Sequence, residues 1–295
     1  MADKESFSIL QQFPIEHSEM DQMRVISPSQ KTWTIDMTQN KILGFSRMRF
    51  DQYLLSKALS EGAKLIEEKV IGLQKNSHGW RIITQDSSYD ARTLVGADGA
   101  CSVIRKCTVG SLDKNDLGAC FGYIFKGIVE KGVVINFLSK TSGYIWVIPR
   151  GDNTCIGGGS TKINQLREIK KKVDMFIEAC YPRLEKVSQW SALIPNVKSP
   201  QTLLSQVAGP NWALIGDAAG HVSPISGMGI VYALTDGELA AEAIAEGHVE
   251  QFNKAWVAFY GKKLIREIWL RSLIYQRPIL EAYCMYIKLH SQIRF

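Results

Sequence analysis

The segment Trp212–Gly237 combines residue types that could bind a sugar-like or anionic ligand. An apolar run at its start predicts a short buried strand that ends at Gly216 and Asp217. An aspartate at a strand end can accept hydrogen bonds from hydroxyl groups, and the two alanines that follow leave room for a flat ligand. A Gly-x-Gly pair ending at Gly229 opens a predicted helix over 229–246, whose first N–H groups favour negative charge. The spacing therefore predicts a binding loop, with a plain strand–turn–helix connection as the alternative.

A second segment, Thr93–Arg105, has a related pattern. An apolar strand is followed by Gly96, Asp98 and Gly99, and a helix is predicted to begin near Ser102. By itself this segment could be an ordinary turn with a helix cap. Its position upstream of the first segment favours a role in the same binding region.

Hydrophobic periodicity predicts the elements that position these two segments. An amphipathic helix is expected over 50–61, ended by Gly62, and another over 165–180. From 229 to the end the chain is predicted to be helical, with a break near Pro278. Besides the short strand at Trp212–Ile215, seven strands are predicted. They lie at 64–74, 79–86, 89–99, 119–130, 133–139, 143–149 and 154–160, and the last four favour an antiparallel sheet.

The composition is that of a folded globular protein and excludes a disordered, collagen-like or disulfide-rich chain. The 295 residues are 45% hydrophobic and 22% charged, with 24 Gly and 9 Pro. Met1–Phe13 lacks the continuous apolar core of a signal peptide, and no apolar run is long enough to span a bilayer, so a cytoplasmic protein is expected. No C-x-x-C pair or metal-ligand cluster occurs among the cysteines, so we expect six reduced thiols, at Cys101, Cys107, Cys120, Cys155, Cys180 and Cys284.

The net charge of +6 is concentrated near the C-terminus. Residues 251–295 hold eight basic and two acidic side chains, interleaved with aromatic and aliphatic residues at helical spacing. Such a segment is typical of a helix on an anionic lipid surface, and equally of a solvated helical cap over a substrate domain. Nucleic acid is disfavoured because no nucleic-acid-binding module accompanies the charge.

Three segments together resemble the FAD-dependent oxidoreductases of the glutathione-reductase-type fold, which include flavoprotein monooxygenases and geranylgeranyl reductases. GADGACSVIR, from Gly96, is similar to their Asp-Gly motif, and GDAAGHVSPISGMGI, from Gly216, to their Gly-Asp motif. Their Arg-x-x-Phe-Asp-x-x-Leu segment is matched by Arg47, Phe50, Asp51 and Leu54. The resemblance implies an α/β (α+β) fold, with an incomplete FAD-binding Rossmann-like domain, an antiparallel substrate domain and a helical C-terminus.

A fourth match narrows the resemblance to the geranylgeranyl reductase and digeranylgeranylglycerophospholipid reductase branch. Tyr144, Trp146 and Pro149 fit its Tyr-x-Trp-x-Phe-Pro segment, with Ile148 in place of Phe. Aromatic side chains that alternate along a strand would form an apolar wall for an isoprenoid chain, although they could instead be sheet core. These three matching residues are the candidate substrate-binding residues.

A glycine also favours the reductase branch. Gly220 stands where monooxygenases usually carry His, so the next residue, His221, is expected to be a neighbour rather than a catalyst.

The resemblance also implies eight cofactor-binding residues: Arg47, Val70, Asp98, Gly99, Gly216, Asp217, Gly229 and Ile230. Arg47 would contact the cofactor, unless it is a solvated surface charge, and Val70 would pack beside the adenosine through its backbone. Asp217 would bind the ribitol or pyrophosphate, with Gly229 and Ile230 at the pyrimidine edge of the flavin. Asp98 and Gly99 would hold the cofactor domain together.

The Gly-x-Gly-x-x-Gly motif of the family occurs nowhere in this sequence. In the family it belongs to a βαβ unit at the start of the chain, which holds the FAD pyrophosphate. We therefore expect a family member that begins late, with four segments: the first part of the FAD-binding domain (1–110), the antiparallel substrate domain (111–205), the second part of the FAD-binding domain (206–247) and the basic helical segment (248–295).

The resemblance implies an FAD-dependent reductase of isoprenoid C=C bonds in lipid biosynthesis. Flavin N5 would give a hydride to one alkene carbon while a proton reaches the other. The electron source would be NADPH or a ferredoxin-like carrier, and no catalytic proton donor is identified. A flavin-dependent monooxygenase or halogenase is the alternative within the fold. A non-catalytic fragment, or one half of a split flavoenzyme whose N-terminal half comes from another chain, is the alternative of another class.

Overall fold

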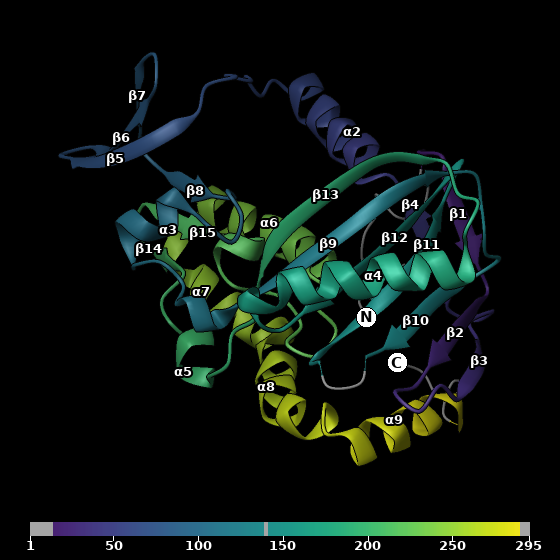
Figure 1. Cartoon of the computed structure of the whole chain (residues 1–295). Helices are drawn as coiled ribbons and strands as arrows, with labels where there is room; N and C mark the ends of the chain where they lie inside the picture. The colour runs from purple at the N-terminus through teal and green to yellow at the C-terminus, as the bar shows by residue number, and fades with distance from the viewer. Residues whose placement is uncertain (1–13, 139–140, 290–295) are drawn as a thin grey trace. The chain divides into compact units, whose positions relative to one another are not determined.

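The computed structural model describes residues 14–138 and 141–289, and its contacts divide the chain into two compact units (Figure 1). Unit 1 comprises Met1–Leu65, Ala119–Ala192 and Ile274–Phe295, and unit 2 comprises Ile66–Gly118 and Leu193–Leu273. Residues 290–295 of the predicted basic segment, which include Arg294, lie outside the described residues, as do 1–13. Contacts alone assign no ligand to either unit, so the division into FAD-binding and substrate domains stays a prediction.

Unit 1 is built on a seven-stranded sheet with the strand order β13-β9-β12-β11-β10-β2-β3. The strands are β2 (Gln22–Ile26), β3 (Thr32–Asp36), β9 (Leu117–Lys126), β10 (Val133–Phe137), β11 (Gly143–Arg150), β12 (Asn153–Ser160) and β13 (Lys186–Pro195). The four central strands, β9 to β12, pair antiparallel, which confirms the predicted sheet. β2 pairs parallel to β10 and was not predicted, nor were β3 and the separate pair β1 (His17–Met20) and β4 (Ile42–Phe45).

Helices cover both faces of this sheet. The amphipathic helix α4 (Leu166–Cys180), predicted at 165–180, packs Ile169 and Val173 against the inward residues of β9, β11 and β12 (Figure 1). On the opposite face, α9 (Arg277–Leu289) packs Leu280 and Cys284 against β2 and β3. The middle of that second face carries the aromatic side chains of β11 and β13.

The predicted helix at 50–61 is α2 (Arg47–Ser60). It begins three residues earlier than expected because the Ser46 side chain accepts a hydrogen bond from the Arg49 backbone N–H at 3.5 Å. Gly62 follows its end with a φ of +96°, as expected of a helix-stopping glycine.

Unit 2 holds both motif segments. Its sheet has the order β14-β15-β8, from β14 (Ala208–Gly209), β15 (Trp212–Leu214) and β8 (Leu94–Gly96), with β15 and β8 parallel. The other strands, β5 (Val70–Asn76), β6 (Gly79–Thr84) and β7 (Ser88–Ala91), form an antiparallel sheet. The helices are α3 (Val103–Thr108), α5 (Pro200–Leu203), α6 (Ile230–Ala245), α7 (Phe252–Trp256) and α8 (Lys262–Ile274), with a π-helical turn, η5 (Val257–Gly261), between the last two.

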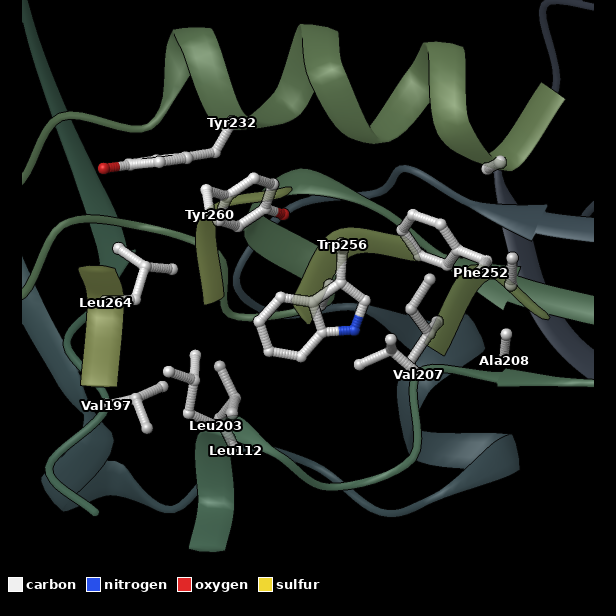
Figure 2. Close-up of a cluster of buried hydrophobic side chains, with 14 of the residues drawn as sticks. Leu112, Val197, Leu203, Val207, Ala208, Tyr232, Phe252, Trp256, Tyr260 and Leu264 are labelled. Atoms are coloured by element: carbon white, nitrogen blue, oxygen red, sulfur yellow. The ribbon is translucent and has the colours of Figure 1, made fainter. Parts of the chain in front are cut away.

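The core of unit 2 gathers around α6, α7 and α8. Figure 2 shows Trp256 at the centre of this cluster, with Phe252, Val207 and Leu203 around it. Trp256 and Phe252 are almost completely buried, so they anchor the helices that follow the Gly-Asp segment. Within the described residues, no helix combines the length and apolarity needed to cross a bilayer.

Candidate functional site

The Gly-Asp segment forms the predicted strand–turn–helix. β15 leads into a short 3-10 turn, η3 (Gly216–Ala218), in which Gly216 has a φ of +56°. A Cβ at Gly216 would lie 3.0 Å from the Cβ of Ala233 on α6. The turn therefore needs glycine both for its left-handed conformation and for its close approach to the helix.

Asp217 lies against the N-terminus of α6. A Cβ at Gly229, the residue before α6, would lie 3.2 Å from Asp217 Oδ1 and 3.1 Å from Val222 Cγ2. Asp217 is half-buried, and Ile230 opens the helix with an exposed side chain. Because the first N–H groups of a helix favour negative charge, they and the carboxylate together can bind hydroxyl and anionic groups. The structure thus brings together Gly216, Asp217, Gly229 and Ile230.

The Asp98 carboxylate faces its own helix. It accepts hydrogen bonds from the Val103 and Ile104 backbone N–H groups at 2.7 and 3.2 Å, and from the Ser102 hydroxyl at 2.5 Å. The helix predicted near Ser102 is confirmed, with Ser102 as its N-cap. Gly99 has a φ of +79° and open space around it. Asp98 therefore fixes the turn at Gly99 by capping α3.

A buried arginine ties α3 to the Gly-Asp turn. Arg105 donates from Nη1 to the carbonyl oxygens of Ala218 and Ala219 at 3.2 and 3.4 Å, and from Nη2 to Ser205 Oγ at 3.4 Å. Burial lowers the pKa of Arg105, and the charge of Asp116 opposes that shift. Sequence reasoning missed this role, although Arg105 ends the second motif segment.

Val70 and Arg47 lie in different units. Val70 is the half-buried first residue of β5 and packs against the core of unit 2. Arg47 is the exposed first residue of α2 in unit 1, and its Nε lies 3.3 Å from Asp51 Oδ1. Neither side chain is placed beside the Gly-Asp turn by these contacts, so both cofactor contacts stay predictions.

A row of aromatic rings crosses the second face of the unit 1 sheet. Tyr144 and Trp146 alternate on β11, with ring centroids 5.8 Å apart. Phe137 of β10 extends the row at 5.9 Å from Tyr144. Trp190 of β13 stacks on Trp146 at 6.2 Å, with an interplanar angle of 26°. We call these four residues the aromatic row. Sequence reasoning identified Tyr144 and Trp146 and missed Phe137 and Trp190.

Glycines make room for the two indoles. A Cβ at Gly157 of β12 would lie 2.7 Å from Trp146 Cζ2, and one at Gly122 of β9 would lie 2.9 Å from Trp190 Cε2. The repeated glycines of these strands are the sequence signal that could have indicated a bulky ring above them. Burial raises the pKa of the Cys155 thiol, and the Trp146 and Trp190 side chains oppose that shift.

Pro149, the third predicted substrate residue, is separated from this row. It lies at an odd position of β11, where buried residues face the opposite side of the sheet from Tyr144 and Trp146. A Cβ at Gly44 of β4 would lie 1.9 Å from the Pro149 carbonyl oxygen, so Pro149 marks where β4 crosses β11.

His221 is fully buried in unit 2 rather than presented to solvent. Its Nδ1 lies 2.8 Å from Asp236 Oδ2 on α6, and its ring centroid lies 4.1 Å from that of Trp256. The Asp236 carboxylate also accepts a hydrogen bond from the Gly216 backbone N–H at 2.8 Å.

No family model matches the chain. The chain is 29% identical over 236 residues to menaquinone reductase of Mycolicibacterium smegmatis, covering 71% of this chain and 56% of the relative. It is 25% identical over 281 residues to digeranylgeranylglycerophospholipid reductase of Methanocaldococcus jannaschii, covering 85% and 69%. The solved structure of a geranylgeranyl bacteriochlorophyll reductase-like protein from Thermoplasma acidophilum matches with a TM-score of 0.73 at 21% identity, covering 94% of this chain and 76% of that one.

The chain therefore spans 56% of the bacterial relative's length and 69% of the archaeal relative's. Because the match to the solved structure covers 94% of the chain, it includes residues of both units. Both comparisons agree with the sequence motifs in the two units: the chain is similar in sequence to digeranylgeranylglycerophospholipid reductases and in fold to a geranylgeranyl reductase-like protein.

Proposed function

We propose that this protein is an FAD-dependent oxidoreductase that reduces C=C bonds of an isoprenoid chain. The aromatic row of unit 1 carries the proposal, because it offers an extended apolar surface to a long, methyl-branched chain of isoprene units. Trp146 and Trp190 stack with ring centroids 6.2 Å apart and add two indole rings to this surface. The printed names of the archaeal relatives, which are reductases of geranylgeranyl groups, support the same substrate class.

The Gly-Asp turn of unit 2 fits FAD. Asp217 can accept hydrogen bonds from ribityl hydroxyls, while the N-terminus of α6 at Gly229 favours negative charge on the cofactor. Asp98 acts indirectly, because its carboxylate caps α3 and thereby fixes Gly99. Once bound and reduced by the electron donor, the flavin would supply the hydride for the alkene. The chain's own residues align the isoprenoid and keep water from the apolar surface.

We further propose that a Gly-x-Gly-x-x-Gly βαβ unit, on this or a second chain, completes the sheet of unit 2. Among the described residues, β8 pairs only with β15, so its other edge offers backbone N–H and C=O groups to one more strand. Val95, at the centre of β8, is 39% exposed. A parallel strand added there would bring the missing phosphate-binding unit beside the Asp-Gly segment.

One face of α8 is both apolar and cationic. Lys262, Arg266, Trp269, Leu270 and Leu273 recur at helical spacing on one side of this helix. Trp269 is 67% exposed and Leu273 is 47% exposed. We propose that this face rests on an anionic lipid surface, with the cations at headgroups and the apolar side chains below.

Vesicle co-sedimentation tests the lipid contact. We expect binding to vesicles that contain anionic lipid, weakened by salt, and reduced in Trp269→Ser. The control is Met175→Ser, which removes a similarly exposed apolar side chain from α4, outside the α8 face. Equal binding of both variants would contradict the proposal.

An alkene reduction assay tests the activity. The chain, with FAD and with or without a Gly-x-Gly-x-x-Gly unit supplied separately, is given a geranylgeranyl lipid and either NADPH or a reduced ferredoxin as electron donor. We expect a more saturated product, and a higher KM for the lipid in Trp190→Ala with flavin retention unchanged. An oxygenated or halogenated product would instead support the monooxygenase or halogenase alternative. A requirement for the added unit would identify a split enzyme.

A further inference from the structure

The buried carboxylate of Asp236 is the meeting point of three hydrogen-bond donors. The Gly216 backbone N–H donates to Oδ2 at 2.8 Å, and His221 Nδ1 lies 2.8 Å from the same oxygen. The Tyr260 hydroxyl donates to Oδ1 and also lies 2.7 Å from His221 Nδ1. Asp236 and His221 are completely inaccessible to solvent, and Tyr260 is 7% exposed. Hydrogen bonds from N–H and O–H groups of the protein, rather than from water, thus stabilise the carboxylate of Asp236.

The protonation states follow from the geometry. Burial, and then the charge of Asp236, raises the pKa of Tyr260, so its phenol stays protonated and donates. His221 Nε2 has no hydrogen-bond partner among the described residues. A proton on Nδ1 gives a donor to Asp236, and the Tyr260 oxygen, 2.7 Å from Nδ1, then serves as a second acceptor. A proton on Nε2 would leave Nδ1 and Asp236 Oδ2 as two acceptors facing each other and would also leave a buried N–H unsatisfied. The Nδ1–H form is therefore assigned.

The π-helical turn η5 brings Tyr260 into this position. It interrupts α7 and α8 at Val257–Gly261, and such turns often occur at functional sites. Figure 2 shows the hydroxyls of Tyr260 and Tyr232 pointing in opposite directions, although their ring centroids are only 4.8 Å apart. The two tyrosines therefore share an environment but differ in their contact with Asp236.

We propose that Asp236, oriented by His221 and Tyr260, is a positioning residue that holds the Gly216–Asp217 turn in its cofactor-binding conformation. The hydrogen bond from Gly216 N–H fixes the residue whose left-handed conformation aims Asp217 at the start of α6. Arg105 donates hydrogen bonds to the carbonyl oxygens of Ala218 and Ala219 in the same turn. Side chains therefore bind both a backbone N–H and two backbone C=O groups of the turn. That the turn binds FAD is part of the proposed function, on which this inference rests.

Hydrogen exchange of single amides tests the proposal without any ligand. In Tyr260→Phe, we expect the Gly216 amide, and the His221 amide that donates to the Gly216 carbonyl, to exchange about tenfold faster. Amides in the buried part of α8, such as that of Leu264, should keep their rates. Tyr232→Phe is the matched control, because it removes the same atom from the same cluster without touching Asp236.

Equal acceleration throughout unit 2, or an unchanged Gly216 amide, would overturn the proposal. If Tyr260→Phe does not fold, a pair of His221 variants replaces it. His221→Asn keeps an amide donor near the position of Nδ1 and should preserve the protection of Gly216, whereas His221→Leu should lose it. The same amide response in both His221 variants would also overturn the proposal.

Flavin titration of the same variants separates this inference from the proposed function. We expect FAD affinity to fall about tenfold in Tyr260→Phe and to stay unchanged in Tyr232→Phe. An equal fall in both tyrosine variants would overturn the positioning role. If the parent chain binds no FAD even with the Gly-x-Gly-x-x-Gly unit, the proposed function fails, while amide exchange still decides whether Asp236 holds the turn.

Discussion

Adding one methyl group beneath Trp190 tests the aromatic row directly. A Cβ at Gly122 would lie 2.9 Å from Cε2 and Cζ2 of Trp190 and 3.0 Å from its Nε1. These three nearest atoms all belong to one side chain, so Gly122→Ala must lift the indole and disturb its stack on Trp146. The variant therefore reports on the position of a single ring.

The expected size of the effect follows from two opposing contributions. Overpacking of this kind costs about 1–3 kcal/mol. Replacing Gly by Ala in a strand returns about 0.5–1 kcal/mol, because the unfolded chain loses freedom. The difference of these two ranges is a fall of about 0–2.5 kcal/mol in the free energy of unfolding of Gly122→Ala. In a Trp190→Ala background the clash is absent, so Gly122→Ala should raise the free energy of unfolding by about 0.5–1 kcal/mol.

Urea unfolding followed by circular dichroism measures this double-mutant cycle without depending on tryptophan emission. The expected coupling energy between Gly122 and Trp190 is about 1–3 kcal/mol. Gly72→Ala on β5 is the control, because the nearest atom to its Cβ would be 4.0 Å away. A coupling energy below about 0.5 kcal/mol would refute the placement of Trp190 over Gly122.

Three further predictions concern pH, thiols and a helix cap. Glu68 accepts hydrogen bonds from Thr84 and Tyr89, which hold its pKa below the usual 4.5. The ionised Glu68 side chain therefore stabilises the fold above about pH 4.5, and this contribution is lost as the pH falls through the lower folded pKa. The Tm difference between the parent and Glu68→Gln should be largest near neutral pH and should disappear in acid. A Tm difference that does not change with pH would contradict this. In the native protein, an aromatic disulfide reagent should react quickly with the three exposed thiols, Cys101, Cys107 and Cys180. The three buried thiols, Cys120, Cys155 and Cys284, should react only after unfolding. Rapid reaction of all six thiols would be incompatible with the fold. Asp98→Ala should lower the free energy of unfolding in urea by about 1–2 kcal/mol, because it removes the acceptor for the Val103 and Ile104 N–H groups while Ser102 remains the N-cap of α3. An unchanged value would show that these hydrogen bonds do not stabilise the turn.

The sequence predicted the elements whose signals are local. The period of α4 and the alternation along β11 each lie within one element, and both elements were confirmed. The strands before α2 were missed because their stability comes from distant partners. β2 pairs parallel with β10 from far along the chain, and β1 buries only Met20 among its residues. Short strands of this kind carry too few apolar positions for their periodicity to be recognised.

In the candidate site, too, the residues with a local sequence signal were predicted and those defined by distant contacts were missed. Gly216, Asp217 and Gly229 were predicted because a strand–turn–helix motif keeps its spacing within one segment. Arg105 reaches Ala218 across 113 positions of sequence, and no local pattern indicates such a contact. Trp190 was missed for the same reason, since its partners belong to other strands of the sheet.

The most direct test of the central claim is anaerobic absorbance spectroscopy of the flavin-loaded protein, supplemented with the Gly-x-Gly-x-x-Gly unit if loading requires it. After chemical reduction and removal of excess reductant, a geranylgeranyl lipid is added, and its fully saturated analogue serves as control. We predict that the absorbance bands of oxidised flavin return with the unsaturated lipid and not with its saturated analogue, because a reduced flavin is reoxidised when it passes its hydride to a C=C bond. Reoxidation by oxygen but not by the unsaturated lipid would contradict an isoprenoid reductase.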